Sequence, residues 1–320
     1  MQNCIIYKYD NKYLNNPQNK AIYLTTIQCP KFDLLRTYLP DNLGDVAKSE
    51  LKEIKEYKDY CPDDDCNTEI EQITIGFLWL LGKCYYEFKS KSHNNTNAFF
   101  IYLVSWLSYK LNQNKGNNFT TINDFFTNNV ISNGKYSKFT NEAFKISDLD
   151  EFMKERTDLL NMNIKDMSKF YDAFKLLCIM YDNYSTNKDN KTLLNSANDF
   201  VKVYASLNND RNIEDTVRNK ILPVLSTNYD HFKNNCNRNG VKCKDFLSLS
   251  EIETNLFALT SEDTSSSSTG NKLFTVLSIF GAIAFFLGIS YKYSLFGFRK
   301  RFKKQQIKEK IKNIKKRMNH

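Results

Sequence analysis

Residues 67–84 read NTEIEQITIGFLWLLGKC, and this stretch decides the fold class. Thr68 and Glu71 stand three residues apart in the arrangement of a capping box, in which each side chain bonds the other residue's backbone N–H. Apolar residues then recur at the three- and four-residue steps of one helix face. They are Ile70, Ile73, Phe77, Leu80, Leu81 and Cys84. The stretch therefore predicts a capped helix whose apolar face is buried.

The same helical spacing recurs along much of the remaining chain. Further predicted helices cover residues 98–111, 166–184, 193–207, 213–232 and 247–259. Pro223 predicts a kink in the fourth of these, because proline removes a backbone hydrogen bond. The first (AFFIYLVSWLSYKL) is very apolar, but its length favours a core helix over a membrane span. No segment shows the sustained polar and apolar alternation of a strand. The sequence predicts an all-α fold.

A second apolar run, residues 273–291, contains 19 residues and no charge. A helix needs about 20 apolar residues to cross the hydrocarbon core of a bilayer. Lys272 and Lys292 flank the run. We therefore expect a single transmembrane helix over residues 272–291. The preceding residues 261–271 (SEDTSSSSTGN) are too small and polar to pack, and they predict a flexible Ser-rich stalk.

The positive charge of the chain is concentrated after this run. Residues 292–320 contain 12 Lys or Arg and one acid, and so carry +11, whereas the whole chain carries a formal charge of +9. The rest is near neutral, so the net charge does not indicate a nucleic-acid-binding protein. Under the positive-inside rule the tail is cytosolic and residues 1–271 lie on the other side. The basic cluster nearest the run contains Arg299, Lys300, Arg301, Lys303 and Lys304.

The tail also has the period of a helix. Apolar residues recur at four-, three- and four-residue steps while basic residues fill the other faces; the apolar set is Ile307, Ile311, Ile314 and Met318. A basic amphipathic helix beside a membrane binds anionic lipid, and an acidic cytoskeletal partner would suit the same charge. The alternative is a stop-transfer cluster followed by a solvated end.

Small residues occupy one face of the predicted span. They are Ser278, Gly281, Ala284 and Gly288. Small side chains let two membrane helices approach closely, so this face predicts a homodimer. Small residues are also common in membrane helices that do not pair, which is the simpler interpretation.

Eight cysteines precede the apolar run, and the tail contains none. They are Cys4, Cys29, Cys61, Cys66, Cys84, Cys178, Cys236 and Cys243. In an oxidising compartment they would form disulfides, and in a reducing cytosol they would be buried thiols or metal ligands. The predicted topology favours disulfides. The spacing of Cys61 and Cys66 lacks the paired C-x2-C pattern of a structural zinc site. The pairing stays open, because eight cysteines allow roughly 100 arrangements.

No catalytic or cofactor-binding signature is present. The histidines, which are His93, His231 and His320, stand outside any Ser/His or Cys/His signature, and the sequence has no glycine-rich phosphate loop. Residues 63–67 (DDDCN) resemble the start of an EF-hand loop, but the turn glycine and the bidentate glutamate are missing. We therefore expect no catalytic, cofactor-binding or metal-binding residue. The N-x-[ST] sequons at Asn94, Asn118, Asn183 and Asn190 are a weak signal in an Asn-rich chain.

Several blocks of the sequence form an ordered set. Residues 29–41 read CPKFDLLRTYLPD, and the blocks that follow are YCPDDDC at 60–66, IGFLWLL at 75–81, NAFF at 97–100, WLSYKL at 106–111, KFYDAFKLLC at 169–178 and the stretch 273–301. In order and spacing they resemble the Plasmodium interspersed repeat (PIR) proteins, a multigene family known as Cir, Bir and Yir in rodent malaria parasites. The resemblance covers residues 29–320.

The resemblance implies an exported, variant, single-span protein of infected red cells and other parasite stages, with a helical, disulfide-bonded ectodomain and no enzymatic activity. It also implies disulfide candidates at Cys29, Cys61, Cys66 and Cys178, and at one of Cys236 and Cys243. Cys84 is additional to the family pattern. Residues 1–28 depart from it, as either a genuine extension or an artefact of the assigned gene start.

These observations predict five segments. They are an atypical extension (1–28), a helical ectodomain (29–260), a linker (261–271), a transmembrane helix (272–291) and a basic cytoplasmic tail (292–320). The N-terminus lacks the apolar core of a secretory signal, so membrane entry would use the span itself. Insertion as a tail-anchored chain is the alternative topology, and it would violate the charge bias.

Two functions are compatible with this organisation. The preferred one is a non-enzymatic variant antigen, exported to the infected red cell or the parasite surface, that serves antigenic variation, immune evasion and host interaction. Its partners would be host-cell surface or serum proteins. Exposed Asn-rich loops would present the variable surface; they are residues 93–97, 113–118 and 183–190. The alternative is an internal trafficking or structural adaptor that acts through the basic tail.

Overall fold

Helices form the regular structure of the residues that the computed structural model of the chain describes. These are residues 20–249, with gaps at 43–50, 55, 62, 91–95, 115, 117, 137–138, 140–148, 187–188, 237–242 and 244–245. Within them, the β-type pairing is limited to an isolated bridge between Thr121 and Asn163. The all-α prediction is confirmed for this part of the chain.

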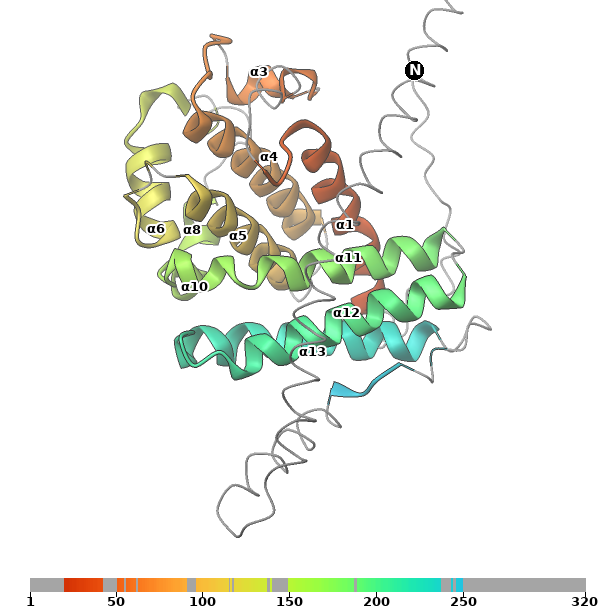
Figure 1. Cartoon of the computed structure of the whole chain (residues 1–320). Helices are drawn as coiled ribbons and strands as arrows, with labels where there is room; N and C mark the ends of the chain where they lie inside the picture. The colour runs from red at the N-terminus through yellow and green to blue at the C-terminus, as the bar shows by residue number, and fades with distance from the viewer. Residues whose placement is uncertain are drawn as a thin grey trace, which may run out of the picture. The chain divides into compact units, whose positions relative to one another are not determined.

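Figure 1 shows the helices of the described residues. In chain order they are α1 (Lys20–Tyr38), η3 (Leu51–Glu53), α3 (Tyr57–Tyr60), α4 (Glu69–Ser90), α5 (Thr96–Gln113), α6 (Ile122–Phe125), η5 (Phe126–Ile131), η6 (Gly134–Tyr136), α8 (Leu149–Lys154), α9 (Thr157–Leu160), α10 (Ile164–Ser168), α11 (Tyr171–Ser185), α12 (Asn190–Asn209) and α13 (Asp215–Cys236).

The chain separates into two units, Met1–Asn255 and Leu256–His320. The second unit lies outside the described residues, and so do the predicted stalk, span and tail and most of the predicted helix 247–259. In the part of the chain that the structure describes, no helix is both long and apolar enough to cross a membrane. α5 is accordingly a core helix, because Phe99, Leu103 and Trp106 are fully buried.

α4 begins with the predicted capping box. The backbone N–H of Thr68 donates to Glu71 Oε2 at 2.9 Å, and the backbone N–H of Glu71 donates to Thr68 Oγ1 at 3.3 Å. The helix then buries the predicted face, where Ile73, Phe77 and Leu80 are fully buried. Residues 72–82 are all buried, so α4 is enclosed by the core on every side along this stretch, and local capping together with this burial explains why it is a helix.

Gly76 lets α4 and α5 approach closely. A Cβ atom at this position would lie 2.8 Å from Cη2 of Trp106 and 3.1 Å from Cδ2 of Leu39. The indole of Trp106 therefore fills the space that a larger residue in α4 would need. The contact also involves Leu39, which follows α1, so three segments of the core meet at this glycine.

α1 is the main element that the sequence analysis did not anticipate. It begins at Lys20, inside the segment predicted to be an extension, and it contains Pro30. α1 packs against α4, α5, α11 and α13. Its buried residues recur at helical steps, and they are Cys29, Phe32, Leu35 and, just after the helix, Leu39.

The predicted helix 166–184 is interrupted, and this prediction is corrected in one respect. The chain forms α10, turns at Lys169 and Phe170, and continues as α11 along nearly the same line (Figure 1). Tertiary bonds hold the turn. Asp166 Oδ2 accepts the backbone N–H of Glu214 at 3.2 Å, and the Lys169 ammonium donates to Asp210 Oδ2 at 2.9 Å.

α11, α12 and α13 pack against one another as a three-helix layer (Figure 1). Aromatic pairs join them: Phe200 stacks on Tyr229 with ring centroids 5.0 Å apart, and Tyr181 meets Phe232 edge-on at 4.8 Å. The predicted helices 193–207 and 213–232 correspond to α12 and α13. Pro223 lies inside α13, and the kink predicted there stays a prediction.

Candidate functional site

A disulfide joins the first described helix to the three-helix layer. Cys29 of α1 is bonded to Cys178 of α11, with Cα atoms 5.3 Å apart, and both residues are buried. The bond crosses 149 residues of sequence. It therefore fixes two elements that the chain alone would leave far apart.

A buried polar cluster lies beside this disulfide, between α1, α5 and α11. Arg36 Nη1 donates to the hydroxyl oxygens of Tyr102 at 3.1 Å and Tyr171 at 3.2 Å, and Arg36 Nη2 donates to Asp33 Oδ1. Burial by itself would lower the pKa of Arg36, but these oxygens and Asp41 outweigh it and hold the pKa above its ordinary value. The guanidinium is therefore a permanent cation inside the fold.

Asp41 connects α1 to α11 in the same cluster. Its carboxylate accepts from the Tyr171 hydroxyl at 2.6 Å and from the Lys175 ammonium at 2.5 Å. Burial alone would raise the pKa of Asp41, but Lys175 and Arg36 together lower it below its ordinary value. The aspartate is therefore ionised and paired from two sides.

Lys110 of α5 is the last member of the cluster, and it binds the backbone of Pro40 and Asp41 after α1. Its side chain is fully buried, and its ammonium donates to the carbonyl oxygens of Pro40 and, at 2.9 Å, Asp41. Burial lowers the pKa of Lys110 to about 7, and the charge of Asp41 opposes that shift. These bonds satisfy carbonyl groups at the end of α1, where a cation is favourable.

The cluster is structural in character. Its charged groups bind one another and the backbone, and they come from three of the sequence blocks quoted above, at 29–41, 106–111 and 169–178. Sequence reasoning recorded the blocks and missed the cluster. The available signal was the presence of Asp33, Arg36, Asp41, Lys110 and Lys175 inside otherwise apolar stretches.

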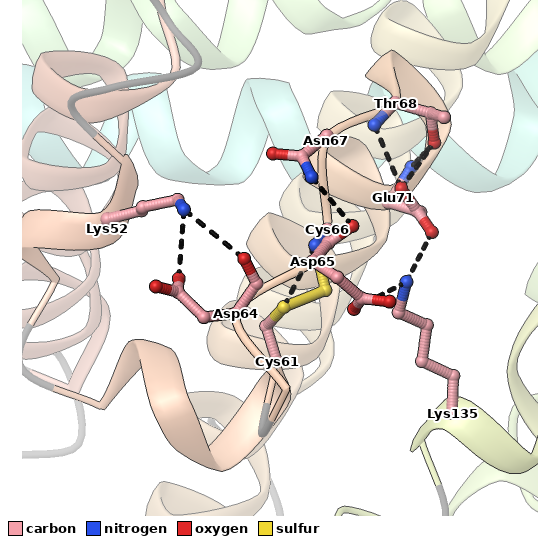
Figure 2. Close-up of a disulfide and its surroundings, with 9 residues drawn as sticks. All are labelled: Lys52, Cys61, Asp64, Asp65, Cys66, Asn67, Thr68, Glu71 and Lys135. Carbon is pink, nitrogen blue, oxygen red and sulfur yellow. Dashed lines mark hydrogen bonds and ion pairs between the residues drawn. A yellow bond between two sulfur atoms is a disulfide. The ribbon is translucent and has the colours of Figure 1, made fainter.

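A second disulfide closes a short acidic loop before α4 (Figure 2). Cys61 and Cys66 have Cα atoms 6.1 Å apart, and the backbone N–H of Cys66 donates to Cys61 Sγ at 3.2 Å. Asp64 in the loop adopts a left-handed backbone with φ 55°, which Asp tolerates better than most residues. The disulfide and this turn give the loop one defined shape.

Two lysines hold the loop from outside. Figure 2 shows Lys52 bonded to Asp64 and Lys135 bonded to both Asp65 and Glu71. The Lys135 ammonium lies 2.9 Å from Asp65 and 2.6 Å from Glu71, and the hydrogen bond to Glu71 chiefly raises the pKa of Lys135. The loop is thus tied to α4 and to η6.

The same loop contains the one cluster of metal-ligand type found among the described residues. The sulfurs of Cys61 and Cys66 and a carboxylate oxygen of Asp65 lie within 4.8 Å of one another. Zinc binds thiolates, but here both sulfurs are in a disulfide and Asp65 is paired with Lys135. In this oxidation state the cluster serves as a crosslink.

The remaining cysteines fall into two groups. Cys236 at the end of α13 is bonded to Cys243, with Cα atoms 5.8 Å apart. Cys84 is a buried free thiol, and burial raises its pKa above the ordinary value. All six disulfide candidates thus lie in disulfides in the structure, with Cys236 and Cys243 paired to each other. Cys4 lies outside the described residues.

The Asn-rich loops lie at separate places on the helical body. The connection after α5 begins at Asn114, which lines a hollow together with Lys165 of α10. The loop predicted at 183–190 is corrected, because residues 183–185 form the end of α11 and Asn190 begins α12. α11 has 15 residues, so about 22 Å of helix separates its two ends. Of the sequons, Asn118 and Asn190 are exposed, while the Asn183 amide is half-buried and donates to Ser196 Oγ at 3.4 Å. The loop at 93–97 and the sequon at Asn94 lie largely outside the described residues.

Two further sets of predicted residues also fall outside the described residues. They are the packing face of the span (Ser278, Gly281, Ala284 and Gly288) and the basic cluster (Arg299, Lys300, Arg301, Lys303 and Lys304). His93 and His320 lie outside as well, and His231 is a half-buried residue of α13.

Comparisons with known proteins point in one direction. A family profile described as "Plasmodium variant antigen protein Cir/Yir/Bir" matches residues 29–292. A solved structure described as "Structure of a Plasmodium PIR protein ectodomain" matches with 31% sequence identity and a TM-score of 0.49, and the match covers 65% of this chain and 91% of that chain. A comparison with curated proteins finds no match.

Proposed function

The chain belongs to the Plasmodium variant antigen family Cir/Yir/Bir, as the resemblance in its sequence predicted, and from this premise we propose that it is a displayed, non-enzymatic variant antigen. Its helical domain would stand outside the membrane of the infected red cell or of the parasite and would serve immune evasion and host interaction. The basic tail would remain in the cytosol.

The observation that carries the proposal is the pattern of disulfides. Three disulfides close loops of very different length, and all their cysteines are buried. Disulfides of this kind form and persist in oxidising compartments and outside cells, and they are rare in a reducing cytosol. An exported or surface domain accounts for them, and a domain that remains in the parasite cytosol does not.

The contrast between a fixed framework and exposed polar residues also supports the variant-antigen function. The disulfides and the buried cluster hold a fixed framework, while Asn118, after α5, and Asn190, at the start of α12, are exposed. Loops on a rigid scaffold tolerate sequence change far better than a core does. A variant antigen needs this combination, because its exposed surface changes while its fold does not.

Antibodies test the display directly. One antibody would be raised against the described domain and a second against a peptide covering residues 302–320. On intact infected cells the first should label the surface, and the second should label only after permeabilisation. If the domain antibody also requires permeabilisation, the displayed-antigen proposal is wrong.

The tail supports a second role in addition to anchoring. Its charge of +11 suits an anionic lipid surface or an acidic cytoskeletal partner, at about 1 kcal/mol for each basic residue near the membrane. The adaptor function would use this segment. A peptide covering residues 302–320 should prefer vesicles of anionic lipid to neutral ones, and equal partition would contradict the lipid version.

A further inference from the structure

A small polar hollow lies between the end of α5 and the start of α10. Its volume is about 210 Å³. The lining comes from three segments, namely Leu111, Asn112 and Asn114, then Phe119 and Thr120, then Asn163, Ile164 and Lys165. Pockets for drug-sized molecules measure roughly 300 to 1,000 Å³, so this hollow suits a single ring.

The walls of the hollow are held in place by short bonds. The backbone N–H of Ile164 donates to the Thr120 carbonyl at 3.0 Å, and Asn163 Oδ1 accepts the backbone N–H of Lys165 at 2.8 Å. Phe119 packs edge-on against the buried ring of Phe125, with centroids 5.4 Å apart. A ligand would therefore enter a preformed site, which reduces the entropy lost on binding.

The loop from α5 is fixed in the same way. Asn114 Nδ2 donates to Glu69 Oε1 at 2.8 Å, and Asn114 Oδ1 accepts the backbone N–H of Gly116 at 3.0 Å. Asn114 therefore shapes the rim with both ends of its amide engaged. The beginning of the loop at 113–118 is thereby tied to the beginning of α4.

Three groups on the rim remain available to a ligand. Within the part of the chain that the structure describes, the side chains of Asn112, Thr120 and Lys165 make no hydrogen bond or ion pair, and all three residues are exposed. They offer an amide, a hydroxyl and an ammonium group. Phe119 contributes the apolar part of the lining beneath them, because Leu111 and Ile164 are buried.

This combination matches one class of ligand. A sugar ring has an apolar face that can pack on the ring of Phe119, and hydroxyl groups that can bond the amide and the hydroxyl on the rim. A carboxylate on the ring would pair with Lys165 through a charge-assisted hydrogen bond. Asn114, which lines the hollow, donates to the carboxylate of Glu69, and this negative charge behind the lining disfavours a more highly charged group such as a phosphate.

We propose that this hollow binds a terminal carboxylated sugar of a glycan. The proposal rests on the displayed-antigen function for its biological meaning, because glycans lie on cell surfaces and on serum proteins. Binding of the sugar in solution does not depend on where the chain is displayed. A failure of the binding experiment would therefore leave the display experiment unaffected, and the reverse also holds.

The test is a titration of the full chain, kept in solution by a polyoxyethylene detergent that contains no sugar. Saturation-transfer NMR would be recorded with N-acetylneuraminic acid and, separately, with its methyl ester, which lacks the charge. The acid should bind in the millimolar range, which is typical of few polar contacts, and the ester about tenfold more weakly.

Matched variants locate the site. Lys165→Met should weaken binding of the acid about tenfold and leave the ester unchanged, whereas Asn112→Ala should weaken both. Lys191→Met is the control, because Lys191 is an equally exposed lysine in the first turn of α12, at the far end of α11. Circular dichroism would verify that each variant is folded. The proposal is overturned if the acid does not bind, if acid and ester bind equally, or if Lys165→Met has no more effect than Lys191→Met.

Discussion

Cys29 and Cys178 form a disulfide that joins α1 to α11, with 5.3 Å between their Cα atoms and 149 residues of sequence between them. The bond encloses α3, α4, α5 and the following short helices in one covalent loop. It brings together the first and the last quoted sequence blocks of the domain, at 29–41 and 169–178. The disulfide therefore links the N-terminal and C-terminal parts of the described domain covalently.

Removal of this disulfide should cost more stability than removal of the short one. In the loop-entropy treatment, a closed loop of 149 residues stabilises by about 5 kcal/mol and a loop of 5 residues by about 2 kcal/mol. Urea unfolding should therefore show a larger loss for Cys29→Ala/Cys178→Ala than for Cys61→Ala/Cys66→Ala. Equal losses would show that the long crosslink does not organise the domain.

Gly76→Ala should destabilise the domain. The new methyl group would lie 2.8 Å from the ring of Trp106, inside contact distance, and the packed core leaves little room for adjustment. Overpacking of this kind costs about 1 to 3 kcal/mol. Gly134→Ala is the matched control, because its methyl group would meet nothing within 4 Å. Equal thermal midpoints for the two variants would contradict the close approach of α4 and α5.

Asp41→Asn should destabilise through the cations that it leaves behind. Arg36 and Lys175 would remain in a largely buried site without their shared carboxylate. Loss of one partner of such a cluster costs about 3 kcal/mol. Asp215→Asn removes an ion pair of the same 2.5 Å length from an exposed aspartate, so its effect should stay below about 1 kcal/mol. Chemical unfolding of the two variants gives the comparison.

Lys110 should make stability rise with pH above neutrality. Its pKa is about 7 in the folded chain, against an ordinary value of 10.5 that applies after unfolding. Between these values the unfolded chain binds more protons, so the free energy of unfolding increases with pH by up to about 1.4 kcal/mol per unit. The contribution is lost as pH falls through 7, where burial of the charge has its full cost.

The test compares the free energy of unfolding of the unchanged protein with that of Lys110→Met between pH 7 and 9. Subtraction of the two unfolding curves removes the groups that both proteins share, including Asp41, Lys175, Arg36 and Glu69 around the ammonium. The difference should grow in favour of the lysine as pH rises. A constant difference would mean that Lys110 keeps its ordinary pKa in the folded protein.

Cys84 should resist alkylation until the domain unfolds. The thiol is buried and its pKa is raised, so very little reactive thiolate is present at pH 8. In a Cys4→Ser background, iodoacetamide should label native protein slowly and should label one thiol per molecule in urea without reductant. Fast labelling of the native protein, or more than one reactive thiol after unfolding, would contradict the assigned cysteine states.

Local patterns were sufficient to predict two of the longer helices. α4 and α12 show regular apolar spacing with a cap at the first turn. α12 and the start of α4 were predicted to within three residues, whereas α4 continues beyond the predicted stretch to Ser90. α1 was missed although Phe32, Leu35 and Leu39 are spaced as in a helix, because Pro30 reads as a helix breaker. Four neighbouring helices compensate for that residue in the fold.

Long-range contacts set the features that local patterns could not give. The spacing of Met167, Phe170 and Phe174 suits one continuous helix, whereas the turn between α10 and α11 lies where Asp166 and Lys169 bond to the segment before α13. The polar cluster likewise depends on pairs more than 100 residues apart. The Cys29–Cys178 disulfide and the hollow beside α10 also bring together residues that are far apart in the sequence, so local patterns could not predict them.

The measurement that tests the central claim most directly is protease treatment of intact infected cells, followed by blots for the domain and for residues 302–320. We predict that the protease removes the disulfide-bonded domain while the tail remains as a protected, membrane-bound fragment. Complete protection of the domain on intact cells, with digestion only after permeabilisation, would contradict its display outside the membrane.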